Sequence, residues 1–133
     1  MVIATCIEAC PAHLIRRRTV ADGTAVPKGT IMKVGDGNLA AASAADLDKF
    51  GGIALEEKVL SDGITEMSCA CGGKWSIAST NAAVTAGCPV VIGAANALRV
   101  AVEADFPLGD TVGRSLTTVG GGGGTLIVEV GAI

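Results

Sequence analysis

Residues 84–102 carry the hydrophobic pattern of a β-hairpin. An apolar, β-branched run covers 88–92 and turn-forming residues follow at 93–96. Apolar Leu98, Val100 and Val102 then alternate with Arg99 and Ala101. Strict alternation places every second side chain on the same face of a strand. We therefore expect two antiparallel strands here, the second with one buried face.

Similar short runs continue along the rest of the chain, separated by turn residues. Gly35–Asn38 predicts a hairpin turn, because glycine and asparagine tolerate positive φ. Ser43–Lys49 predicts a helix of one or two turns, with Ser43 as its N-cap and Gly51 and Gly52 ending it. The other expected strands lie at 14–20, 30–34, 39–42, 53–58, 65–71, 75–78, 111–118 and 125–130. About ten short strands predict an all-β fold: a small β-barrel or β-sandwich of short antiparallel strands with an extended N-terminal arm, 1–12, and at most one short helix.

The chain also echoes itself at an offset of 58 residues. Val26 aligns with Val84, Gly29 with Gly87, Gly35 with Gly93, Asn38 with Asn96 and Gly51 with Gly109. Two explanations fit: 26–56 and 84–114 are pseudo-repeats, or two unrelated hairpins both place glycine and asparagine where φ is positive. With 133 residues, we expect 1–133 to form a single β domain in either case.

The composition indicates contact with other protein chains. Half of the residues are hydrophobic, but aromatic residues make up only 2%. Such a high apolar content is unusual for a small monomer, so we expect some apolar surface to be buried against neighbouring chains. Trp75 is either a core residue or an interface anchor. A membrane span is not expected, because no stretch reaches the roughly 18–20 apolar residues that a spanning helix needs.

Charge and cysteine content restrict the partners and the compartment. The net charge is −3, so the chain lacks the excess of positive charge that is typical of nucleic-acid-binding proteins. The N-terminus lacks the pattern of a secretion signal, so we expect synthesis in the cytoplasm and five reduced cysteines. The one basic cluster, Arg16–Arg18, either meets an acidic surface on a partner or protects an edge strand from aggregation.

Catalytic or metal chemistry has little support in the sequence. His13 is the only histidine, and no motif marks a nucleophile. Cys6, Cys10 and His13, with the pair Cys69 and Cys71, offer a zinc-binding or thiol-dependent alternative, but their spacing fits structural zinc poorly. Gly120–Gly124 reads as a hairpin loop rather than a phosphate cradle. We expect neither an enzyme nor a cofactor.

The second half resembles the small decoration, or cement, proteins of tailed-phage capsids. The resemblance rests on Gly87-Cys88-Pro89-Val90-Val91, Asn96-Ala97-Leu98-Arg99-Val100, Leu108 to Arg114, and Gly124-Thr125-Leu126-Ile127-Val128, within about 80–130. It implies a small β fold that forms a homotrimer on the outer surface of the virion and clamps neighbouring major capsid subunits. It also implies an extended terminal arm lying on the shell.

Together with the composition, the resemblance yields a set of candidate interface residues. These are Val2, Ile3, Arg16, Arg17, Arg18 and Trp75. Another self-assembling β module, which would polymerise without a capsid, remains an alternative.

Overall fold

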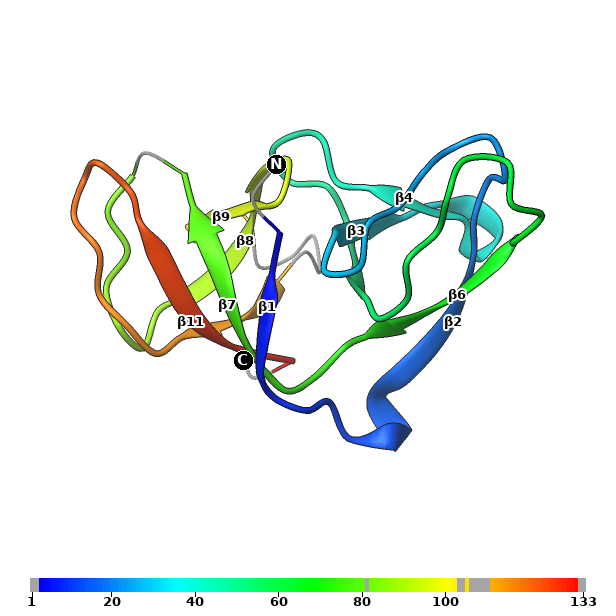
Figure 1. The fold of residues 1–133 in the computed structure, drawn as a ribbon. Helices are drawn as coiled ribbons and strands as arrows, with labels where there is room; N and C mark the ends of the chain where they lie inside the picture. Colours follow the sequence, from blue (N-terminus) through cyan, green and yellow to red (C-terminus); the bar gives the residue numbers. More distant parts are fainter. Residues whose placement is uncertain (1–2, 81, 103–104, 106–110, 132–133) are drawn as a thin grey trace.

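The computed structural model describes residues 3–80, 82–102, 105 and 111–131, and strands dominate it (Figure 1). No helix among these residues has the length and apolar character needed to cross a membrane. Helical structure includes two 3-10 turns, η1 (Ala12–Leu14) and η2 (Asp36–Asn38). The strands are β1 (Thr5–Glu8), β2 (Ile15–Thr19), β3 (Ile31–Val34), β4 (Ala40–Ala42), β5 (Phe50–Ala54), β6 (Glu66–Ala70), β7 (Lys74–Ser79), β8 (Pro89–Ala94), β9 (Ala97–Val100), β10 (Thr111–Ser115) and β11 (Thr125–Val130).

The C-terminal half forms a closed five-stranded barrel. Its strands follow the order β7-β11-β10-β8-β9, and β9 returns to pair with β7. All neighbours are antiparallel except β7 and β9, which pair in parallel through Ala78 with Ala97 and Ser79 with Leu98. Closure covers most strand edges in this half. β1 is added at the start of β7, and Arg99 and Val100 of β9 pair with β8 alone among the described strands.

The N-terminal half is a five-stranded sheet with the same path. Its order is β2-β6-β5-β3-β4, which matches the barrel strand for strand. An isolated parallel bridge between Thr19 and Leu39 lies where β7 and β9 pair in the barrel. In Figure 1 this sheet lies on the right and the barrel on the left.

Backbone contacts outside the strands also recur in the two halves. The N–H of Gly29 donates to Ala54 O, and the N–H of Gly87 donates to Ser115 O. Val26 forms an antiparallel bridge in the first half and Val84 forms one in the second. The two halves therefore share a topology, while a duplication of 26–56 into 84–114 stays a prediction.

One apolar core runs from the barrel into the N-terminal sheet. Ile31, Ile53 and Ala70 of the sheet pack in the same buried cluster as the barrel residues Trp75, Ile77, Ile92, Leu98, Leu126 and Val128. A second, smaller cluster around Met32, Met67 and Cys69 fills the sheet's other face. Neighbouring residues Ile31 and Met32 belong to different clusters, as the two-residue period of a strand requires.

The helix predicted for Ser43–Lys49 is wrong, because this segment forms a turn. Asp48 Oδ2 accepts hydrogen bonds from the N–H groups of Ala44 and Ala45, which closes the turn from its far end. Leu47 has φ of 63°, outside the helical region, and its N–H donates to Ile92 O in the barrel. Contact with the barrel thus overrides the local helix propensity.

The strand predicted at 53–58 is β5 in the structure, and it spans Phe50–Ala54. Gly51 and Gly52 therefore lie inside β5 instead of ending a helix. Gly52 has φ of +115°, and a Cβ there would lie 2.7 Å from Cys69 Cβ on β6. Glycine is required because the neighbouring strand approaches its backbone closely.

Candidate protein-docking site

Exposed apolar side chains gather in the connection between β5 and β6. Val59 is 63% exposed, Leu60 59% and Ile64 39%. We call residues 58–64 the docking loop. The other large exposed apolar residues are distributed along the described chain as Ile3, Ile7, Leu39, Val102 and Leu116.

A buried lysine supports the docking loop. Lys58 side-chain atoms are 0% exposed, and Nζ lies 3.0 Å from Asp62 Oδ1 and 3.2 Å from Asp22 Oδ1. Nζ also donates to Asp22 O at 2.8 Å and to Val59 O at 3.2 Å. The ammonium therefore has four oxygen atoms within hydrogen-bond distance, which compensates the burial of its charge.

The two aspartates hold the loop backbone as well as the ammonium. Asp62 accepts hydrogen bonds from the N–H groups of Val59 and Ile64, at 2.9 and 3.0 Å. Asp22 accepts from the N–H of Gly63 through Oδ1, at 2.7 Å, and from that of Ser61 through its carbonyl oxygen, at 2.9 Å. The apolar tip is consequently presented on a braced backbone.

The electrostatics of this cluster favour its charged form. Burial acts to lower the pKa of Lys58, but hydrogen bonds and charges from Asp62 and Asp22 outweigh it and raise that pKa above 10.5. Burial acts to raise the pKa of Asp62, but hydrogen bonds from Ile64 N–H, Lys58 and Val59 N–H bring it below 3.8. The cation of Lys58 and the carboxylates of Asp22 and Asp62 together leave one excess negative charge beside the loop.

A second candidate surface is an open, mainly apolar cavity of about 730 Å³ beside β1, which we call the arm groove. β1 and the residues flanking it form one wall, and the N-terminal sheet and its loops contribute another. Trp75 is 3% exposed and donates from Nε1 to Gly72 O at 2.9 Å. It therefore lies in the core at the base of the groove rather than on the surface. The lining residues are Ile3, Ala4, Thr5, Cys6, Ala9, Cys10, Ile15, Lys28, Gly29, Leu55, Glu57 and Trp75.

The expected interface residues do not form one patch. Ile3 is 39% exposed and lines the arm groove, while Val2 lies outside the described residues. Arg18 is directed inward, because its guanidinium donates to Gly51 O and to Asn38 Oδ1. Along β2, Arg16 and Arg17 point to opposite faces of the strand.

The two exposed arginines differ in their contacts. Arg17 donates to Ser68 Oγ and lies 3.6 Å from Glu56 Oε2. Arg16 Nη1 donates to His13 O and forms no ion pair within the described part of the chain. Arg16 therefore offers the freer positive charge of the two.

The cysteines and His13 do not assemble a metal site within residues 3–80, 82–102, 105 and 111–131, where no group of three potential ligands is placed to hold an ion. Cys69 is buried, which raises the pKa of its thiol to about 11, with a further contribution from Cys71. This thiol stays protonated at neutral pH and is a poor nucleophile.

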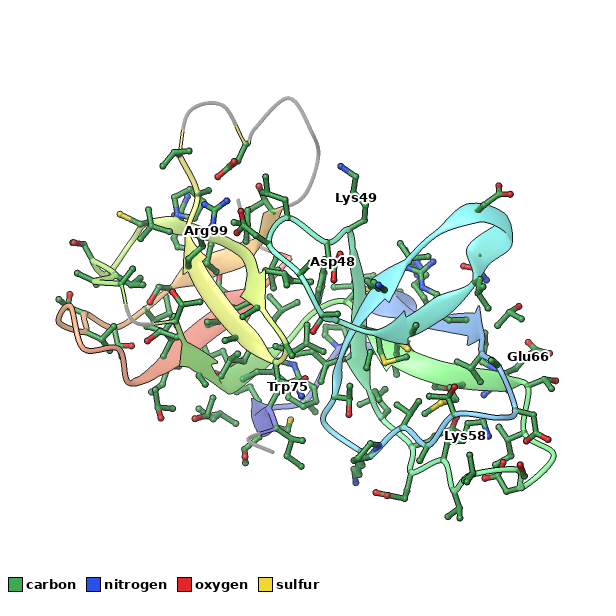
Figure 2. All side chains as sticks on the ribbon, turned by 90° about the horizontal axis from the view of Figure 1, so that it is seen from above. Asp48, Lys49, Lys58, Glu66, Trp75 and Arg99 are labelled. Atoms are coloured by element: carbon green, nitrogen blue, oxygen red, sulfur yellow. The ribbon has the colours of Figure 1, made fainter. Side chains whose placement is uncertain are left out.

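A second ion cluster joins the two halves of the chain. Arg99 Nε lies 2.6 Å from Asp46 Oδ1 in the 43–49 turn, and Arg99 Nη1 lies 2.9 Å from Asp105 Oδ2. The hydrogen bond from Arg99 is the main cause of the lowered pKa of Asp105. Figure 2 shows Arg99 and Lys58 in opposite halves of the molecule, so the two clusters are separate.

Sequence reasoning missed both clusters. The spacing of Lys58 and Asp62 and the turn pair Asp62-Gly63 were visible signals, but burial of the lysine depends on Asp22, which lies far away in the sequence.

A scan against models of known protein families finds no match to the chain, and neither does a search of curated proteins.

Proposed function

We propose that this chain is a viral structural protein: a decoration protein that binds the outer surface of a tailed-phage head and stabilises it by bridging major capsid subunits. Its partners are the major capsid protein and further copies of itself, most simply as a homotrimer. Binding to the assembled shell alone stabilises that shell by mass action, and no chemical step is required.

The observation that supports this proposal best is the state of β1. This strand pairs with β7 in antiparallel register, yet all four of its side chains are exposed, including Ile7 at 50%. A strand that leaves all of its side chains substantially exposed gains less hydrophobic stabilisation from its own fold than a buried strand does. Contact with a second protein would provide that burial, which fits the terminal arm implied by the resemblance.

We place the shell contact at the end of β1 that lies outside the arm groove. Ile7 and Glu8 do not line the groove; Ile7 is 50% exposed, and the Glu8 side chain, 63% exposed, pairs with Lys74 Nζ at 2.7 Å. Arg16 adds an exposed positive charge for an acidic surface on the shell.

The test is sedimentation of the purified protein with undecorated heads, using Ile7→Asp as the interface variant. Val102→Asp is the matched control, because Val102 is 55% exposed and lies after β9. We expect the wild type and the control to pellet with heads, and Ile7→Asp to remain largely in solution. Wild-type protein that stays in the supernatant at every stage of head maturation refutes the proposal.

A further inference from the structure

The chain contains three Asp-Gly pairs, Asp22-Gly23, Asp36-Gly37 and Asp62-Gly63. In such a pair the side-chain carboxyl carbon can reach the next backbone nitrogen, and glycine adds no Cβ that would hinder the approach. Attack by this nitrogen closes a five-membered succinimide ring, which opens again to give isoaspartate. The structure places the three pairs in contrasting surroundings.

Asp36-Gly37 lies at the exposed tip of the hairpin between β3 and β4. The Asp36 carboxyl forms no hydrogen bond or ion pair within the described part of the chain. No atom outside the neighbouring residues would lie within 4 Å of a Cβ at Gly37, so the turn is open on this side. The carboxyl can therefore rotate toward the Gly37 nitrogen without breaking a contact.

The Lys58 cluster, which consists of Lys58, Asp22 and Asp62, restrains the other two pairs. The Asp62 carboxylate accepts hydrogen bonds of 2.9–3.0 Å from Lys58 Nζ and from two backbone N–H groups. The nitrogen that would attack it, Gly63 N, donates instead to Asp22 Oδ1 at 2.7 Å. Asp22 Oδ1 also accepts from Lys58 Nζ at 3.2 Å. Neither carboxylate can rotate toward the following nitrogen without losing these bonds.

The charge of Asp62 acts in the same direction. Ring closure proceeds from the protonated carboxyl, because the departing oxygen then leaves as water. Burial acts to raise the pKa of Asp62, but hydrogen bonds from Ile64 N–H, Lys58 and Val59 N–H lower it. The Asp62 carboxyl therefore stays ionised, and slow to close a ring, over a wider pH range.

We propose that Asp36 is the site at which the folded chain forms isoaspartate, and that the Lys58 cluster protects Asp22 and Asp62 from the same reaction. Gly37 N attacks Asp36 Cγ, so an N–Cγ bond forms and the Cγ–OH bond breaks. The hydroxyl leaves with the amide proton as water. Water then adds to the backbone carbonyl carbon of Asp36 and breaks its bond to Gly37 N, which regains a proton.

The product carries the chain through Cγ and has a free α-carboxylate. One water is released and one is consumed, so the reaction needs no further reagent. The turn between β3 and β4 gains one methylene group in its backbone, directly before the residues that hold it in place. Asn38 binds this turn to β2 through Arg17 O and Arg18 Nη1. Isoaspartate at position 36 therefore loosens the hairpin from β2.

The test follows isoaspartate in each pair separately. Trypsin cleaves after lysine and arginine, so the pairs fall in three different peptides, 19–28, 34–49 and 59–74. Folded wild-type protein is aged at neutral pH and digested, and isoaspartate is measured by enzymatic methyl transfer from S-adenosylmethionine. Peptide fragmentation that distinguishes the two linkages assigns the product to Asp36 or to Asn38.

We expect isoaspartate to accumulate in peptide 34–49, at Asp36, at least about tenfold faster than in the other two peptides, because hydrogen bonds to charged groups must break before those can react. Asp36→Glu is the matched control. Glutamate keeps the charge at this exposed position, but it would have to close a larger ring, so the product at position 36 should disappear. In guanidinium chloride the three wild-type rates should converge, since only the fold separates them.

Two variants test the protection by the Lys58 cluster. Lys58→Met removes the shared cation, and isoaspartate in peptide 59–74 should form at least about tenfold faster, while peptide 34–49 ages as before. Asp22→Ala gives the same readout without removing the buried lysine. It takes away the acceptor of Gly63 N–H, so this nitrogen becomes available to attack Asp62.

Two results overturn the assignment of Asp36: equal rates at the three pairs in the folded wild type, or aged wild type without isoaspartate at position 36. Peptide 59–74 ageing at the wild-type rate in both Lys58→Met and Asp22→Ala refutes the protection. The inference does not depend on capsid binding. Protein that fails to bind heads refutes only the decoration function, and an unmodified Asp36 refutes only the isoaspartate site.

Discussion

The side-chain oxygen of Asn96 accepts a hydrogen bond of 2.8 Å from the backbone N–H of Ile31. Asn96 occupies the β8–β9 turn of the barrel, and Ile31 begins β3 of the N-terminal sheet, so this buried bond joins the two halves. Asn38, its counterpart at the 58-residue offset, makes its side-chain hydrogen bonds within the N-terminal half. Its Nδ2 donates to Arg17 O, and its Oδ1 accepts from Arg18 Nη1.

Replacement of these two asparagines by glycine should have unequal effects. Both residues have positive φ, 54° for Asn96 and 65° for Asn38, which glycine adopts without strain. Asn96→Gly leaves the buried Ile31 N–H without its acceptor, and we expect a loss of about 1–3 kcal/mol in the free energy of unfolding. Asn38→Gly, at an exposed site, should cost less than about 1 kcal/mol. Urea denaturation measures both, and equal losses would contradict the bridging role of Asn96.

Lys58→Met should loosen the docking loop. The variant leaves Asp22 and Asp62 without their shared cation, and the loop loses the bonds from Nζ to Asp22 O and Val59 O. We expect a lower Tm and faster proteolytic cleavage within 58–64. Lys28→Met, at an exposed lysine, is the control and should leave both properties nearly unchanged. Cleavage of the loop at the wild-type rate would show that the lysine does not brace it.

Stability should decline in acid. The pKa values of Asp48, Asp62 and Asp105 lie below 3.8 in the folded chain. A carboxyl with a lowered folded pKa stabilises the fold above its unfolded pKa and loses this contribution as pH falls through the folded value. We therefore expect the free energy of unfolding to fall below about pH 4.

The same linkage gives the alkaline limit and a variant control. The pKa of Lys58 is raised above 10.5, so its contribution is complete below that pH and disappears as pH rises through the folded value. Asp62→Asn should flatten the acid dependence by removing one titrating carboxyl. Urea midpoints across the pH range check both points, and an Asp62→Asn profile identical to the wild-type profile would contradict the assignment.

Gly52→Ala should be strongly destabilising, whereas Gly120→Ala should not. An alanine at 52 combines φ of +115° with a 2.7 Å approach to Cys69 Cβ, and no atom outside the neighbouring residues lies within 4 Å of a Cβ at 120. We expect a loss of about 1–3 kcal/mol for the first and about 0.5 kcal/mol or less for the second. Thermal or urea unfolding measures the difference, and a neutral Gly52→Ala would show that β5 and β6 do not need their close approach.

The sequence supplied most of the strands because their signals are local. Alternating apolar residues and turn pairs determined the β3–β4 and β8–β9 hairpins, and Gly37 and Asn38 have the positive φ that the turn required. The all-β class followed from the same signals. The Ser43–Lys49 segment failed because a hydrogen bond to Ile92 in the barrel decides its shape.

The candidate site was less accessible from sequence because it depends on distant partners. Lys58 looks like a surface residue in the sequence, and only its contact with Asp22, 36 positions away, explains its burial. Arg16–Arg18 looked like one basic cluster, but strand alternation and the bonds of Arg18 separate the three side chains. Ile3 was expected at an interface and lines the arm groove, while its contact with another protein stays a prediction.

The central claim, binding to an assembled phage head, is tested most directly by titrating undecorated heads with the wild-type protein and measuring the bound fraction in the pellet. Decoration of a repeating shell predicts saturable binding at a fixed ratio to the major capsid protein, together with greater thermal stability of the heads. A pellet without bound protein, or binding that rises without saturation and leaves head stability unchanged, would contradict the claim.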